Sequence, residues 1–98
     1  MFTPGEVNSI RQLANAAARE RVTNAQLQSL VQMALMTGVH ELDMELDARA
    51  KEGKMGRDFP SRLKAALARL TYEEENENKR RQKRAVFIKY VIRLKGGR

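Results

Sequence analysis

The feature that most constrains the fold is a helix-start signal that occurs twice, each time followed by apolar residues three and four positions apart. Thr3–Glu6 and Thr23–Gln26 both have capping-box spacing, with a hydroxyl first and a carboxylate or amide three residues later. Pro4 suits the first helical position. Two amphipathic helices are therefore predicted, with the apolar stripes Val7, Ile10, Ala14, Ala17 and Ala18, then Leu27, Leu30, Val31, Ala34 and Leu35.

Glycines and a second pair of apolar stripes divide the middle of the chain. Gly38 is expected to end the second helix in the left-handed conformation, and Gly53 to end a third helix over about 39–52. Residues 53–58 have no periodicity and are predicted to be the main loop, with Asp58 as the N-cap of a fourth helix. The stripes are Val39, Leu42, Leu46 and Ala50 in the third helix, and Leu63, Ala66, Leu67 and Leu70 in the fourth.

The C-terminal part permits two interpretations. Residues 73–84 contain no apolar side chain, and acid-before-base pairs four residues apart favour a solvated helix over a charged linker. Residues 85–94, AVFIKYVIRL, fit a helix ended by Gly96–Gly97, with Gln82, Ala85, Lys89 and Arg93 on one stripe. They fit a strand less well, because no other segment has a strand pattern and the partner would have to come from a second chain.

The predicted fold class is therefore all-α, a small helical bundle of four to five helices. Residues 1–98 form a single domain, with a helical body over 1–72 and a charged and apolar C-terminal extension over 73–98. Twelve alanines and few aromatic residues suit helix-on-helix packing.

Positive charge is concentrated at one end of the chain. Residues 79–98 hold nine Lys and Arg and no acid, whereas residues 1–78 hold ten Lys and Arg against twelve Asp and Glu, so the net charge of +7 comes from the tail. Such a cluster attracts phosphates, although nearby glutamates at 73–75 and 77 cancel part of its field. The predicted nucleic-acid-binding residues are Lys79, Arg80, Arg81, Lys83, Arg84, Lys89 and Arg93.

The apolar run beside this cluster predicts self-association. Its surface is too large to leave in water, so a homo-oligomer interface is expected from Val86, Phe87, Ile88, Tyr90, Val91, Ile92 and Leu94. An anionic membrane surface is a weaker alternative, because the apolar side chains surround the segment instead of forming one face.

A partial helix-turn-helix spacing starts at Leu30, with small and turn residues at Ala34 and Gly38. Its second helix, however, carries four acids where phosphates require positive charge, and Asp47 stands where a core residue is needed. A simple helical hairpin is preferred. The acidic side of this segment could instead face a basic surface, such as the tail of a neighbouring chain.

Catalytic and metal-binding signals are weak. His40 is the only histidine, so the zincin-like start HELDM lacks its second zinc ligand, and there is no cysteine. We expect no enzymatic activity and no cofactor, and the cytoplasm as the compartment. The predicted function is a small nucleic-acid-binding accessory or regulatory protein, with DNA and RNA both open. The alternative is a protein–protein interaction module, an adaptor or inhibitor without nucleic-acid contact.

Overall fold

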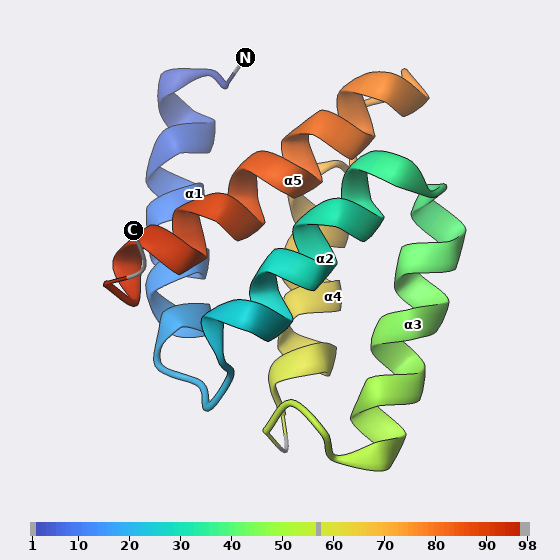
Figure 1. Ribbon diagram of the computed structural model, residues 1–98. Coiled ribbons are helices and arrows are strands. Elements are labelled where there is room, and N and C mark those ends of the chain that lie inside the picture. Colours follow the sequence, from blue (N-terminus) through green and yellow to red (C-terminus); the bar gives the residue numbers. More distant parts are fainter. Residues whose placement is uncertain (1, 57, 97–98) are drawn as a thin grey trace.

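Five helices account for most of the residues described by the computed structural model, which are 2–56 and 58–96, and no strand occurs among them. The helices are α1 (Pro4–Ala18), α2 (Asn24–Met36), α3 (Val39–Glu52), α4 (Phe59–Leu70) and α5 (Glu77–Leu94). Antiparallel α2 and α5 lie side by side in front of α1 and α4, and α3 stands beside them, packed on α4 (Figure 1). The predicted all-α bundle is confirmed.

Both predicted capping boxes are formed. The Thr3 hydroxyl accepts the Glu6 N–H at 3.2 Å and the Glu6 carboxylate accepts the Thr3 N–H at 3.1 Å, while Thr23 and Gln26 repeat the exchange at 3.1 and 3.0 Å. Gln26 also donates through Nε2 to the carbonyl of Lys54 at 2.9 Å, which ties the start of α2 to the loop before α4. These local signals therefore fix two helix starts as the sequence predicts.

Residues 85–94 are helical, as the preferred interpretation predicts, and lie within α5. The predicted charged helix over 73–84 is only partly formed, because α5 begins at Glu77. Asn76 caps it, accepting the Lys79 N–H at 3.1 Å, and residues 71–76 connect α4 to α5. Gly97, part of the predicted helix stop, and Arg98, part of the basic tail, lie outside the described residues.

Two predicted cap residues behave differently from the expectation. Gly38 has a φ of −70° and is the N-cap of α3, because only two residues separate α2 from α3 and this leaves no room for a left-handed cap. Asp58 is the N-cap of α4, as predicted, and its carbonyl accepts the Arg62 N–H at 3.0 Å, but its side chain accepts no N–H from the helix.

Two glycines in the loop before α4 are left-handed for different reasons. Gly53 ends α3 at φ +65°, as predicted, and a Cβ there would meet no neighbouring atom. Gly56 has a φ of +77° and passes close to the connection between α1 and α2, so that a Cβ would lie 2.5 Å from the Arg21 carbonyl oxygen. The second position therefore requires glycine for conformation and for space.

The core lies where α5 meets the other helices. Phe87, Ile88 and Val91 of α5 are fully buried, and α5 packs mainly against α2 and α1. The expected C-terminal extension therefore differs from the body in charge, whereas its helix α5 packs into the same core as the other helices. The other large, fully buried side chains are Leu27, Leu30 and Val31 of α2, Leu42 and Leu46 of α3, Met55, and Phe59, Leu63 and Leu67 of α4.

Candidate nucleic-acid interface

Helix α5 divides its side chains between the core and the surface by helical spacing. Gln82, Val86, Lys89 and Arg93 recur three and four residues apart and are exposed. Ala85, predicted on the same stripe, is buried because it lies nearer the side of α5 that carries Ile88 and Ile92. The predicted basic cluster is therefore distributed around the helix, and its members have different surroundings.

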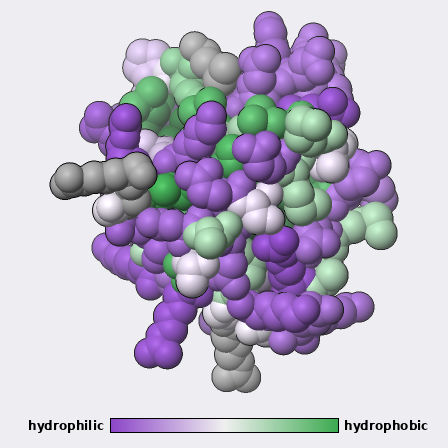
Figure 2. Space-filling view, viewed as in Figure 1, coloured by the Kyte–Doolittle hydropathy of each residue, from purple (hydrophilic) through white to green (hydrophobic). Residues whose placement is uncertain are grey.

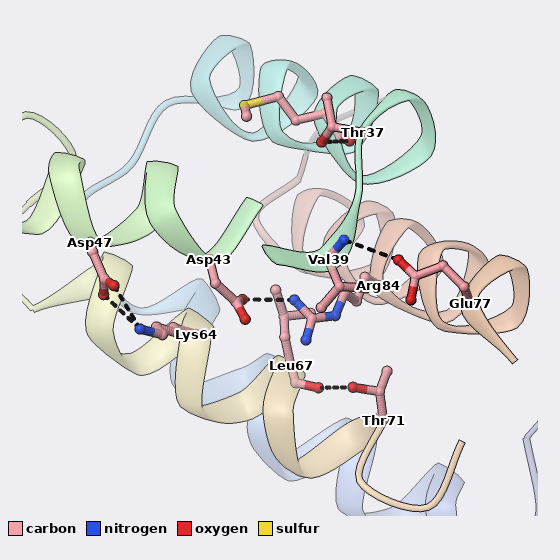
Figure 3. Close-up of polar contacts among 10 residues, drawn as sticks. Thr37, Val39, Asp43, Asp47, Lys64, Leu67, Thr71, Glu77 and Arg84 are labelled. Atoms are coloured by element: carbon pink, nitrogen blue, oxygen red, sulfur yellow. Dashed lines mark hydrogen bonds and ion pairs between the residues drawn. The ribbon is translucent and has the colours of Figure 1, made fainter. Parts of the chain in front are cut away.

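Arg84 is an internal residue. Its side chain is 3% exposed, and its Nη1 donates to Oδ1 of Asp43 on α3 at 2.8 Å (Figure 3). Beside it, Oε1 of Glu77 accepts the Val39 N–H at 3.2 Å, at the exposed start of α3. The guanidinium of Arg84 is thus not accessible for the predicted phosphate contact, because it packs against the acidic side of α3 in the same chain.

Lys83 lies between two carboxylates and an aromatic ring. Its Nζ is 3.6 Å from Glu6 and 3.4 Å from Glu74, and 5.8 Å from the centroid of the Phe2 ring. Both carboxyl groups have a lowered pKa. The main cause for Glu6 is the backbone N–H of Thr3 and for Glu74 that of Asn76, with Lys83 adding to both. Only 11% of the Lys83 side chain is exposed, so it is largely occupied by its own chain.

Three further basic residues are partly engaged. Arg81 lies 3.7 Å from Glu77, one turn earlier, and both Arg80 and Arg81 are half-buried. Their Nε atoms, like that of Arg84, are buried without a hydrogen-bond partner among the described residues. Lys95 donates through Nζ to the carbonyls of Ala18 and Glu20 at 3.3 and 3.0 Å, satisfying acceptors at the end of α1.

The remaining predicted residues are accessible. Lys79, Lys89 and Arg93 are exposed and make no ion pair within the part of the chain that the structure describes. Most of the KRRQKR segment is therefore buried or half-buried, and two of the three accessible cations lie in the second half of α5.

A neighbouring helix extends this accessible surface. Helix α2 contains no charged residue, and α5 contains no acid after Glu77. The exposed side chains of these two adjacent helices form what we call the α2–α5 face, which is viewed from the front in Figures 1 and 2. It carries the amides of Gln28, Gln32 and Gln82, the cations Lys79, Lys89 and Arg93, and, between residue 78 and the end of α5, no carboxylate.

The predicted oligomer interface is largely inside the molecule. Phe87, Ile88, Val91 and Ile92 are buried against the other helices of the same chain, and Tyr90 is partly buried. Only Val86 and Leu94 are exposed, at 40% and 38%. The apolar run is thus buried without a second copy of the chain. Self-association stays a prediction, but burial of this run no longer supports it.

The structure also bears on three other features considered from the sequence, which are a helix-turn-helix, a metal site and contact with a membrane. Asp47, where a helix-turn-helix requires a core residue, is exposed and 2.7 Å from Lys64 of α4 (Figure 3). Within residues 2–56 and 58–96, no group of three potential metal-ligating side chains comes together. None of the helices described combines the length and apolar character needed to cross a membrane.

Comparison of the chain with protein-family models, with curated proteins and with solved structures found no match. The sequence predicted the exposed cations of α5. It did not predict the part played by the exposed glutamines of α2, although the absence of charged residues over 24–36 was a signal for it.

Proposed function

We propose that this protein binds nucleic acid through the α2–α5 face, as an accessory or regulatory protein without catalysis of its own. Lys79, Lys89 and Arg93 contact phosphates. The observation that carries the proposal is that this face has no carboxylate after Glu77 at the start of α5, in a chain that has twelve acids in all. A surface of one sign concentrates polyanions, whereas interspersed carboxylates would repel them.

The amides on the same face suit contacts that cations alone do not make. Gln28 and Gln32 are exposed on α2, and Gln82 on α5. An amide side chain both donates and accepts hydrogen bonds, as base edges and sugar hydroxyls require. The combination of amides and cations supports a nucleic acid as the polyanion in preference to a simple acidic peptide.

Salt dependence gives the proposal a quantitative form. Each phosphate contact that releases a counterion contributes a slope of about −0.9 to the plot of log affinity against log salt for a duplex, and about −0.7 for a single strand. Three cations therefore predict a slope of about −2 to −3. This value is smaller than the nine basic residues of the tail would give if all of them reached phosphates.

The test compares two double charge reversals that change the net charge equally. Lys89→Glu with Arg93→Glu alters the α2–α5 face. Lys51→Glu with Arg69→Glu alters exposed cations on α3 and α4 that make no ion pair with any described residue. Binding to fluorescent oligonucleotides is measured by anisotropy at several salt concentrations, with helicity checked by circular dichroism.

We expect the first variant to lose most of its affinity and to reduce the salt slope by about 1.4–1.8, from two contacts. The control should lose much less, because its cations lie away from the face. Equal losses in both variants would attribute binding to net charge alone. No binding by the unmodified protein at low salt would remove the proposal.

A protein-interaction module is the second candidate, and a specific observation favours it. Met36, Met44 and Tyr72 are 77%, 58% and 81% exposed, which is high for large apolar side chains. Methionine and tyrosine adapt well to protein partners. Retained folding together with no nucleic-acid binding in the experiment above would leave this second function as the better explanation.

A further inference from the structure

A small apolar groove lies where α1 and α5 meet, at the border of the α2–α5 face. Its lining includes Phe2 and Val7 on one side and Val86 and Tyr90 on the other, with Arg11 at its edge. Val7 and Val86 are 36% and 40% exposed, and Phe2 and Tyr90 are partly exposed. An open groove of this composition, with two aromatic rings, leaves apolar surface uncovered.

Positive charge borders the groove. Arg11 is exposed on α1 beside it. On α5, Lys89 follows Val86 by three residues and Arg93 follows Tyr90 by three, so each cation is an immediate helical neighbour of a lining residue. Arg11, Lys89 and Arg93 make no ion pair among the described side chains. The groove thus combines a mainly apolar lining with one lining cation, Arg11, and two further cations one turn from its lining on α5.

Its size limits what can enter. The groove has a volume of about 220 Å³, below the roughly 300–1,000 Å³ typical of small-molecule sites. This volume suits one planar ring and is small for the apolar face of a helix. A second copy of this chain would bring the same cations against each other, which is unfavourable.

We infer that this groove receives a base of single-stranded nucleic acid, with the neighbouring phosphates on Arg11, Lys89 and Arg93. The inference rests on the proposed function and narrows it, because a duplex keeps its bases stacked inside and cannot offer a base face. Cationic tracks with aromatic platforms are the general means of binding single strands, since every base has a face that can stack. Tyr90 is the stacking residue, and Phe2, already covered by Lys83, closes the far side.

The decisive experiment changes the nucleic acid and leaves the protein intact, so folding is not at issue. Anisotropy is measured with a thymidine oligonucleotide of about ten nucleotides, within the ~4–16 usual for such sites, and with an abasic strand of the same phosphate count. We expect the thymidine strand to bind about tenfold more tightly, as one base–aromatic stack provides. A duplex with the same number of phosphates serves as the third probe and should bind less tightly than the thymidine strand, because its bases are not accessible.

Tyrosine emission reports whether the base reaches the groove. The chain has two tyrosines and no tryptophan, so Tyr72→Phe leaves Tyr90 as the only tyrosine, and Tyr90→Phe leaves Tyr72. Tyr72 is 81% exposed, and its loss should not disturb the fold. Thymidine strands should quench the emission of Tyr90 and not that of Tyr72, and abasic strands should quench neither.

The outcomes separate this inference from the function on which it rests. Equal affinity for thymidine, abasic and duplex probes, with Tyr90 emission unchanged, would overturn the groove as a base site and leave phosphate binding by the face intact. Quenching of Tyr90 by an acidic peptide, with none by thymidine strands, would assign the groove to a protein side chain instead. No binding of any probe at low salt would overturn both proposals.

Discussion

Replacing Asp43 by alanine should reveal how strongly the fold depends on the buried arginine of α5. The substitution leaves the guanidinium of Arg84, 3% exposed, without the carboxylate 2.8 Å away. Removing one partner of a buried ion pair typically destabilises a protein by 3–5 kcal/mol, because the other charge stays buried and uncompensated. Since Asp43 is 28% exposed and water can partly replace it, we expect about 3 kcal/mol, the lower end of this range.

A matched control lies one turn further along the same helix. Asp47 is also bonded to a cation, Lys64 of α4 at 2.7 Å, but the two side chains are 56% and 39% exposed. Asp47→Ala makes the same change in helix propensity and net charge, and loss of this surface pair should cost under about 1 kcal/mol.

Urea unfolding followed by circular dichroism measures both variants. A loss of ~3 kcal/mol lowers the midpoint by about 2 M at a slope of ~1.5 kcal/mol per M. In a thermal scan it lowers the Tm by about 12–24 °C, at roughly 4–8 °C per kcal/mol for a domain of this size.

Equal destabilisation by Asp43→Ala and Asp47→Ala would refute the reasoning, because Arg84 would then have to be solvated without its partner. Arg84→Met provides a second check. It removes the buried charge and keeps most of the packing, so it should destabilise less than Asp43→Ala. It should also leave oligonucleotide affinity unchanged, whereas a phosphate-binding arginine at this position would reduce it.

Two further predictions concern pH and the loop before α4. The lowered pKa values of Glu6 and Glu74 mean that the unfolded chain takes up protons first on acidification. The stability that these groups contribute is therefore present above their unfolded pKa of about 4.3 and is lost as pH falls through their lower folded values. Urea midpoints should fall below about pH 4.3, and less so with both residues changed to Gln; an unchanged pH dependence in that double variant would contradict this. Gly53→Ala should destabilise the protein by about 1–2 kcal/mol, for the left-handed conformation alone. Gly56→Ala should destabilise it by more, because its Cβ would also meet a backbone carbonyl. Equal effects in urea unfolding would show that the connection between α1 and α2 shifts to make room for the Cβ.

Local signals made much of the fold predictable. The capping boxes at Thr3 and Thr23 need only residues within the same helical turn, and both are present as expected. Apolar stripes at helical spacing likewise identified most of the core. Residues 85–94 permit both a strand and a helix in the sequence, because β-branched and aromatic residues suit strands. Burial against two other helices favours the helix over this local preference.

The candidate site was less predictable, because it depends on which residues meet across long stretches of chain. Arg84 and Asp43 are separated by 41 positions, and nothing local to either indicates that one neutralises the other. The basic run therefore resembles a uniform phosphate-binding patch in the sequence. Folding sorts it into an internal ion pair, a bridge at Lys83 and exposed cations further along, among them Lys89 and Arg93.

The central position of α5 also affects how the chain can fold during its synthesis. Helix α5 is translated after every helix that it covers, so the apolar side of α2, including Leu27 and Leu30, has no complete partner until then. At about 5–20 residues per second, the 18 residues of α5 take roughly 1–4 s to make. During this interval the nascent chain exposes surface that chaperones or other nascent chains can bind. Rare codons within this segment would lengthen the exposure without altering a single amino acid.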